Sequence, residues 1–325
     1  MYAEKYGLLL TLTLLIFGCQ SQNIENKNIS LSQENCLEIE HSQGKTCIPK
    51  NWQTVVTLDS VTAENLIALG IKPVGTTFSS LSQHFEDELI NVTNIGEIGE
   101  PNLEKILQLK PDLIVGIDSN ENIYNQLSQI APTVLVKFNH SGEWREVFKN
   151  FSILINKEEL WQKSITDYEN RLVEFKQKMG NNLAEIEVSV VRIYPDSINL
   201  YLRDSFAGTI LTDAGLSRPE SQNIGAEEAQ KITGNPIQMK ISKEALNQAD
   251  GDVIFIWTGE NDPQINAELQ QKIIELQKDP LWQNLKAVKN GRVYQVPSYW
   301  IGSGPLAANL ILDDLFKYLV PLENK

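Results

Sequence analysis

One pattern of hydrophobic and polar residues occurs twice in this chain. Residues 102–117 read NLEKILQLKPDLIVGI, and residues 242–257 read SKEALNQADGDVIFIW. In both copies a small polar residue opens a short amphipathic run, a tight turn follows, and an aspartate leads into an apolar segment. Each copy therefore predicts a capped helix that turns into a buried strand. Such a unit occurs in any α/β protein, but residues 64–75 and 209–219 also echo each other, each with a helix that ends in glycine and turns at a proline. The two repeats together predict two lobes of similar build that enclose a cleft.

The rest of the pattern alternates short apolar runs with amphipathic ones, which favours a mainly parallel sheet in each lobe. In the first lobe we expect strands at residues 55–58, 71–77 and 133–136, helices at 62–69 and 123–130, and a loop-rich segment at 78–98. In the second lobe we expect strands at 188–193, 198–202 and 293–296, helices at 207–214 and 265–277, and a last helix with Pro305 in its first turn.

A long amphipathic segment lies between the two lobes. Residues 158–179 place apolar side chains four and three positions apart, and the pattern stops at Gly180 and Asn181. A coiled-coil stripe has the same spacing, but this one is short and has strands on either side. We therefore expect one packed helix of about 30 Å that joins the lobes and limits their closure on binding. The predicted fold class is α/β, with two Rossmann-like lobes, each a mainly parallel sheet flanked by helices, joined by one long α-helix.

The first residues differ from the rest of the chain. Residues 7–18, GLLLTLTLLIFG, are too short to span a bilayer comfortably and fit the core of a signal peptide that ends before Cys19. Cleavage before Cys19, with lipid attached to its sulfur, is the favoured interpretation; cleavage elsewhere and an uncleaved anchor are the alternatives. The predicted organisation is a signal peptide at 1–18, a lipidated tether and hairpin at 19–50, a first lobe at 51–154, the joining helix at 155–181 and a second lobe at 182–325.

Export places the other two cysteines where thiols oxidise. Cys36 and Cys47 bracket LEIEHSQGKT, which predicts a hairpin that turns near Gly44. A disulfide between them is the favoured interpretation and contributes about 3 kcal/mol in the chain-entropy model. Two buried thiols are the alternative, and a metal pair is disfavoured because no second cysteine pair or histidine couple lies nearby in the sequence.

Composition and charge exclude several classes of function. The 325 residues carry a net charge of -14 at a sequence pI of about 4.8, so the overall field repels nucleic acid and anionic membrane. Any anionic ligand therefore needs a local cationic pocket. The three histidines, His41, His84 and His140, form no metal-spaced pair, and the sequence has neither a GxSxG elbow nor a P-loop. These observations disfavour an enzyme and a zinc importer component.

Four motifs together resemble a known family. ALGIKPVG, EPNLEKILQLKPDLIVG, DPLWQNLKAVKNGRVYQV and GPLAANLILDDL occur in this order within residues 50–322. This order resembles the iron-siderophore solute-binding proteins of bacterial ABC importers, of the ferric-citrate and ferric-hydroxamate group. The resemblance implies a class III periplasmic binding protein, anchored to the membrane by lipid in the periplasm. It also implies a ferric siderophore as ligand, ABC permease subunits as partners, a monomer, and no cofactor or metal ligands of its own.

The ligand-binding candidates stand where predicted strands end and loops begin. A bulky ferric chelate needs aromatic walls and a few cationic donors. The candidates are Arg192, Tyr194, Arg203, Trp257, Tyr299 and Trp300, with Phe78 and Ser119 in first-lobe loops as weaker choices. The alternative role is an ion pair for either arginine and core packing for Trp300.

The chain departs from this family at two positions. Ile98 stands where its members usually carry an arginine, and Ser119 stands near a second arginine of citrate binders. The loss of both cations favours a larger, less anionic chelate, such as a hydroxamate or a mixed citrate-hydroxamate. Haem, a corrinoid, or a role as membrane-tethered ligand sensor remain alternatives.

Two acids occupy equivalent positions in the repeated unit. Glu104 and Glu244 each stand in the first turn of a predicted helix. An acid there complements the helix dipole, which is worth about 0.5 kcal/mol. The resemblance implies instead that the two acids meet arginines of the permease, one from each lobe. The matched positions favour this docking role.

Overall fold

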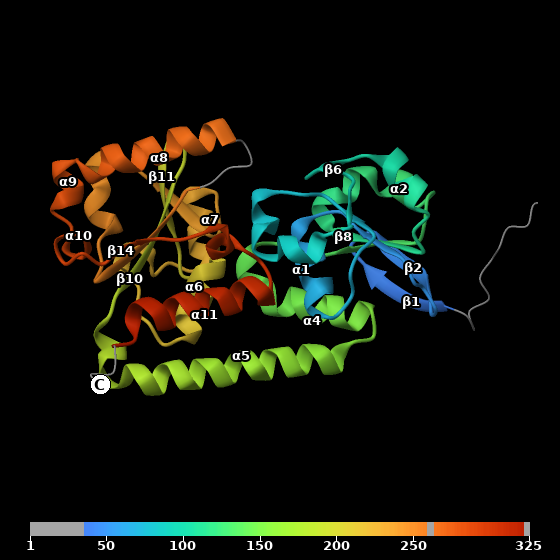
Figure 1. Ribbon diagram of the computed structural model, residues 1–325, viewed down its shortest axis with the longest axis horizontal. Coiled ribbons are helices and arrows are strands. Elements are labelled where there is room, and N and C mark those ends of the chain that lie inside the picture. The colour runs from blue at the N-terminus through green and yellow to red at the C-terminus, as the bar shows by residue number, and fades with distance from the viewer. Residues whose placement is uncertain (1–35, 259–262, 322–325) are drawn as a thin grey trace, which may run out of the picture.

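The computed structural model describes residues 36–258 and 263–321 (Figure 1). The expected signal peptide, Cys19 and the polar tether up to residue 35 lie outside the described residues. Within the described part, no helix combines the length and the apolar character needed to cross a membrane.

The first lobe is built on a five-stranded sheet in which all paired strands are parallel. Its order is β5-β4-β3-β8-β9, with β3 (Val55–Thr57), β4 (Gly75–Thr76), β5 (Thr93–Asn94), β8 (Leu113–Ile117) and β9 (Thr133–Val136). The accompanying elements are α1 (Ser60–Ala68), η2 (Ser80–Leu89), α2 (Leu103–Leu109), α3 (Tyr124–Leu127), α4 (Trp144–Leu154) and the short antiparallel pair β6 (Gly96–Glu97) and β7 (Glu100–Pro101).

The second lobe has a five-stranded sheet in the order β12-β11-β10-β13-β14. Strands β10 (Val188–Ile193), β13 (Val253–Trp257) and β14 (Val293–Gln295) are parallel, while β11 (Ile198–Tyr201) and β12 (Gln238–Ile241) extend one edge antiparallel. The helices are α6 (Phe206–Asp213), α7 (Ala226–Thr233), α8 (Pro263–Gln277), α9 (Pro280–Gln283), α10 (Lys286–Lys289) and α11 (Pro305–Leu319). The predicted α/β fold with two lobes is confirmed.

The repeated sequence pattern corresponds to a repeated structure. The backbone N–H of Asp112 donates to the Thr54 carbonyl at 2.9 Å, and that of Asp252 donates to the Glu187 carbonyl at 2.8 Å. The carboxylate of Asp112 accepts the Gln53 N–H at 2.8 Å, and that of Asp252 accepts the Glu187 N–H at 2.9 Å. Hydrogen bonds from Gln53 and then Thr54 lower the pKa of Asp112. Each aspartate therefore fixes its strand against the first strand of its own lobe.

The two copies differ in their helices. The first copy forms helix α2, and its N-cap Asn102 accepts the Lys105 N–H at 2.9 Å. The second copy forms the 3₁₀ helix η7 (Lys243–Ala249), and its N-cap Ser242 makes no side-chain capping bond. Both helices contain seven residues, but a 3₁₀ helix is more tightly wound and has poorer hydrogen-bond geometry. The capped helix expected in the second copy is therefore replaced by a 3₁₀ helix without a side-chain cap.

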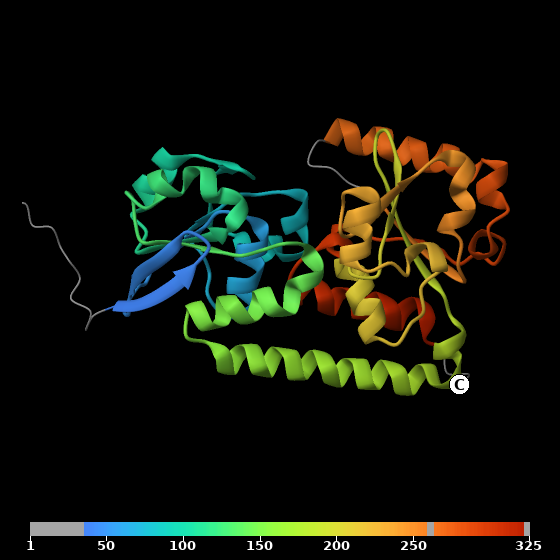
Figure 2. The ribbon, with the colours of Figure 1, turned by 180° about the vertical axis from the view of Figure 1, so that it is seen from behind.

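A long helix, α5 (Glu158–Met179), runs along one side of both lobes (Figures 1 and 2). Its bounds are those predicted, and it ends at Gly180 in a positive-φ conformation. Its buried side chains pack against α4 and α11 as part of the largest hydrophobic cluster, which contains residues of both sheets. The stripe therefore belongs to a globular core. Its buried side chains are Ile165, Tyr168, Leu172, Phe175 and Met179.

Polar contacts also join the two lobes directly. Glu64 of α1 accepts the backbone N–H of Ala307 in α11 at 2.8 Å, and its second oxygen lies 3.2 Å from His84 Nε2. The Ser298 hydroxyl donates to the Ser80 carbonyl at 2.8 Å. The His84 and Glu64 side chains are only 2% and 3% exposed. We call these five residues the inter-lobe seam.

The N-terminal hairpin consists of β1 (Cys36–His41) and β2 (Gly44–Pro49). It turns at Gly44, whose φ of +112° favours glycine, and a disulfide joins Cys36 to Cys47 as predicted. The backbone N–H of Ser42 donates to the Leu135 carbonyl at 3.1 Å, which attaches the hairpin to the first sheet.

Three local expectations are wrong. The strand predicted at residues 71–77 is limited to β4. The helix predicted at residues 123–130 is limited to α3, which follows the 3₁₀ helix η3 (Asp118–Ile123). The segment predicted as loop-rich at 78–98 contains η2, whose Phe85 and Leu89 are buried beneath Leu306 of α11. Packing against the last helix, remote in sequence, orders this segment.

Candidate ligand-binding site

The carboxyl ends of the second-lobe strands face the first lobe at a cavity of about 310 Å³. Ligands of open α/β sheets commonly bind at such ends. Ser80 and Gln83 of η2 form one wall, and Ser298 joins the floor at the inter-lobe seam. We call this hollow the amide pocket, because its lining is Ser80, Gln83, Trp257, Thr258, Asn266, Gln270, Gln295, Val296, Pro297 and Ser298.

Arg192 is held between two aromatic rings next to this pocket. Its guanidinium carbon lies 3.9 Å from the ring centroid of Trp257 and 4.0 Å from that of Tyr194. Its Nη1 donates to the Tyr194 hydroxyl at 2.7 Å and to the Tyr201 hydroxyl at 3.3 Å. Cation–π contacts and these bonds fix the guanidinium in one orientation. The structure thus brings together three of the predicted residues, Arg192, Tyr194 and Trp257.

Arg203 has a different environment. Its Nε donates to Asp204 at 3.2 Å, and the second oxygen of Asp204 accepts the Ala226 N–H at the start of α7 at 2.7 Å. A Cβ atom added at Gly225 would lie 2.4 Å from Arg203 Nη2, so the guanidinium packs directly on this turn. The ion-pair alternative therefore describes Arg203 in this structure, although its side chain remains 42% exposed.

Tyr299 and Trp300 bind one carboxylate. The Tyr299 hydroxyl and the Trp300 indole N–H both donate to Asp314 Oδ2, each at 2.8 Å. Burial and this hydrogen bond raise the pKa of Tyr299. Trp300 is fully buried and stacks on Phe255 with centroids 4.2 Å apart. Trp300 therefore belongs to the hydrophobic core and does not form an open wall of the cleft. Core packing was the alternative interpretation of this residue.

The two first-lobe candidates lie apart. Phe78 is 36% exposed and lines a hollow of about 320 Å³ that also contains Gln83. Gln83 therefore connects this hollow to the amide pocket. Ser119 is exposed in η3, directly after β8, and lines neither hollow.

Sequence reasoning missed the amides of the pocket. Thr258 directly follows β13, and Gln295 ends β14, so the rule that ligands bind at the carboxyl ends of parallel strands could have found both. Gln83 and Gln270 lie on helices and carry no comparable signal, because exposed glutamines are ordinary on helix surfaces.

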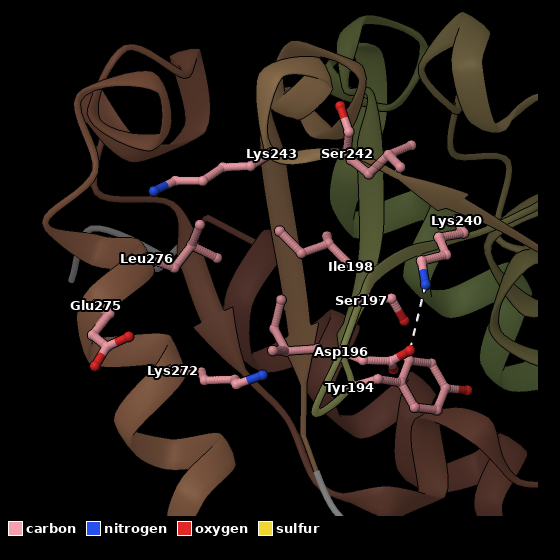
Figure 3. Close-up of a pocket in the computed structure, with 12 residues that line it drawn as sticks. Tyr194, Asp196, Ser197, Ile198, Lys240, Ser242, Lys243, Lys272, Glu275 and Leu276 are labelled. Carbon is pink, nitrogen blue, oxygen red and sulfur yellow. Dashed lines mark hydrogen bonds and ion pairs between the residues drawn. The ribbon is translucent and has the colours of Figure 1, made fainter.

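A separate hollow of about 390 Å³ lies under α8 (Figure 3). Every residue that lines it comes from the second lobe, so it is not part of the cleft. Lys240 forms an ion pair with Asp196 at 3.4 Å, and Lys272 extends into the hollow toward Asp196 and Tyr194. Tyr194 thus borders this hollow as well as Arg192.

The described residues contain no group of three or more histidine, cysteine, aspartate or glutamate side chains placed to hold a metal ion. The polar groups that the structure does bring together are a guanidinium, aromatic rings, amides and hydroxyls. These groups bind a ligand through its outer atoms.

Known proteins resemble this chain over most of its length. Residues 55–300 match the family described as periplasmic binding protein. The probable siderophore-binding lipoprotein YfiY of Bacillus subtilis is 34% identical, and the match covers 94% of each chain. Staphylococcus aureus SirA complexed with staphyloferrin B superimposes with a TM-score of 0.75 at 28% identity, covering 87% of this chain and 98% of SirA. FeuA from Bacillus subtilis complexed with ferri-bacillibactin gives a TM-score of 0.68 at 27% identity, covering 87% and 98%. On these matches, this chain belongs to the periplasmic binding protein family.

Proposed function

We propose that this chain captures a ferric siderophore between its two lobes and delivers it to an ABC importer. The observation that carries the proposal is the fixed Arg192, which presents a cation beside an inter-lobe cavity in a chain of net charge -14. At an effective dielectric near 20, a guanidinium about 4 Å from an anionic oxygen gains about 4 kcal/mol. The related proteins YfiY, SirA and FeuA carry siderophores in their names or complexes, which supports the same ligand class here.

The chelate that fits best is a hydroxamate or a mixed citrate-hydroxamate. Ile98, at the place of one expected arginine, is 45% exposed, and Ser119 is also exposed. The first lobe therefore offers no guanidinium at either position, and a small, highly charged ferric citrate would lack cationic partners there. Haem, a corrinoid or a sensing role within the same fold are the competing functions. We assign the chain no enzymatic activity, because the relatives are named as binding proteins.

The acids Glu104 and Glu244 serve, in this proposal, to dock the loaded protein on the permease. Each is exposed and is the second residue of its helix. Hydrogen bonds from its own backbone N–H and from Ser242 lower the pKa of Glu244, which keeps it ionised at neutral pH.

Both acids lie near the carboxyl edge of their sheets. The Asn102 N–H that opens α2 donates to the carbonyl of Ile95, just beyond the end of β5. Ile241 is the last residue of β12, just before η7. It pairs with Ile198 of β11, which pairs in turn with Ile193, the last residue of β10. In each lobe the acid therefore follows a segment at the carboxyl edge of the sheet, and this likeness supports the docking proposal.

The remaining assignments follow from the same role. We propose that Cys19 carries the lipid that anchors the protein in the periplasm, since YfiY and YhfQ of Bacillus subtilis are named lipoproteins. The protein acts as a monomer with ABC permease subunits as its partners.

Titration of tryptophan fluorescence tests the ligand class. Purified protein lacking residues 1–18 is expected to bind a ferric hydroxamate with a Kd between about 1 nM and 1 μM. The comparison set is ferric citrate, a ferric catecholate, haem and cobalamin. Quenching by haem or cobalamin alone would overturn the siderophore assignment.

Arg192→Gln is expected to weaken binding of the best ferric chelate about 30-fold, because the charge-assisted contact is lost and the shorter, neutral amide cannot replace it. Arg203→Gln is the comparison, and its effect should stay within about threefold because Arg203 packs on the turn at Gly225 and does not line the amide pocket. Isothermal titration calorimetry measures both. An unchanged Kd for Arg192→Gln would remove Arg192 from the binding site.

A further inference from the structure

The amide pocket differs from the rest of this acidic protein in its chemistry. Among the described residues that line it, none is ionisable, and the polar groups are amides and hydroxyls. Its apolar walls come from Trp257, Val296 and Pro297. Such a lining can hydrogen-bond a ligand group but cannot neutralise a charged one.

The amides are already aligned by hydrogen bonds. Gln295 Nε2 donates to Gln270 Oε1 at 3.2 Å, and Gln270 Nε2 donates to the Thr258 hydroxyl at 2.9 Å. A primary amide offers two N–H donors and a carbonyl oxygen with two lone pairs. The bonds among Gln295, Gln270 and Thr258 therefore use only part of the hydrogen-bonding capacity of the two glutamines. Across the cavity, Gln83 makes no side-chain hydrogen bond within the described part of the chain. Donors and acceptors therefore face the hollow from both lobes.

The size of the pocket restricts what can enter. At about 310 Å³ it lies at the lower limit of ordinary ligand sites, which is too little for a whole ferric chelate. One arm of a chelate fits. The neighbouring Arg192, which shares Trp257 with the pocket, then meets the oxygen-rich iron centre outside it.

We propose that the amide pocket selects an uncharged arm of the chelate that carries an amide or hydroxyl group. This inference rests on the proposed siderophore function and adds to it the polarity of the bound arm. An ammonium or carboxylate in the pocket gives up hydration and meets no counterion among the described residues that line it, whereas an amide exchanges its water for the glutamine groups. Because Gln83 and Gln270 come from different lobes, the bound arm also connects them.

Two probes that differ only in one arm test this selection. They are the iron complex of desferrioxamine B, whose free end is an ammonium group, and the same complex after acetylation of that amine. The wild-type protein is expected to bind the acetylated complex about tenfold more tightly. The net charge of -14 would favour the cationic probe instead, so this preference has to come from the pocket.

Gln270→Glu changes the pocket without changing its shape, and we expect it to reverse the preference toward the ammonium probe. The matched control is Gln271→Glu, which adds the same charge one residue along α8 at an exposed position outside the lining. Gln270→Ala with Gln295→Ala should reduce the tenfold ratio to about one. Calorimetry gives the ratio for each variant.

The outcomes separate this inference from the proposed function. If both probes bind and the Gln270→Glu ratio equals that of wild type, the pocket does not contact the arm. If Gln271→Glu reverses the preference equally, the effect is long-range charge, and the inference also fails. If neither probe nor any other ferric chelate binds the wild-type protein, the proposed siderophore function is wrong, and the role assigned to the amide pocket is wrong as well.

Discussion

Replacing Glu64 with alanine is expected to lower the free energy of unfolding by about 3 kcal/mol. The carboxylate is buried, accepts the Ala307 N–H from α11, and lies 3.2 Å from Nε2 of the buried His84 of η2. Alanine removes the acceptor and leaves the Ala307 N–H buried without it. Urea denaturation followed by circular dichroism measures the loss. Because these bonds join α1 to α11, we also expect the unfolding transition to broaden as the lobes lose their coupling.

Two further variants isolate the cause. Glu64→Gln keeps an oxygen that can accept the Ala307 N–H, so its loss should be about half that of alanine. Glu88→Ala, at an exposed position on η2, should change stability by less than about 0.5 kcal/mol. A Glu64→Ala protein as stable as the Glu88→Ala control would show that the inter-lobe seam contributes little to the fold.

Replacing Glu104 and Glu244 together with alanine is expected to reduce uptake of the radioactive ferric chelate about 100-fold. Cells that lack the native protein and express the double variant are the test. The reason is the loss of two charge contacts to the permease, one from each lobe. The purified double variant should bind the chelate with unchanged Kd, because both side chains are exposed and line neither the amide pocket nor the Phe78 hollow.

Glu227→Ala is the matched control for the docking acids. Glu227 is also exposed and is also the second residue of its helix, α7, where it pairs with Lys231 at 2.7 Å. Its replacement removes a first-turn acid of the same kind without touching the repeated unit, and uptake should be preserved. Equal loss of uptake in this control, or weakened chelate binding by the double variant, would contradict the docking role.

The sequence predicted those parts of the fold that local patterns determine. The first helix–strand unit, α5 and the cysteine hairpin each depend on spacing within a few turns or strands, and each is present as expected. The second unit keeps its strand β13, but its helix is of the 3₁₀ type and has no side-chain cap. Strands β9 and β10 also have their predicted bounds, because short apolar runs between turn residues leave few alternatives.

The sequence did not reveal what long-range packing decides. Helix α7 buries only Ala229, so no apolar stripe marks it in the sequence, and strand β12 is fixed by pairing with β11. Trp300 was a reasonable choice for a cleft wall, but Phe255 and Asp314 fill its surroundings and hold it in the core. The amide pocket depends on side chains from η2, α8 and β14 meeting in space. No local pattern marks that meeting.

Helix α5 affects how a permease could distinguish the loaded protein from the empty one. If Glu104 and Glu244 dock on the permease as proposed, a helix of 22 residues, reinforced by the inter-lobe seam, is expected to keep their separation nearly constant whether or not the chelate is bound. A permease that sensed only this separation would accept vacant and filled carriers alike, so vacant copies would compete for its surface. Discrimination would then depend on the exposed surface of the bound chelate, and we expect the rate of iron entry to follow the ratio of loaded to empty protein.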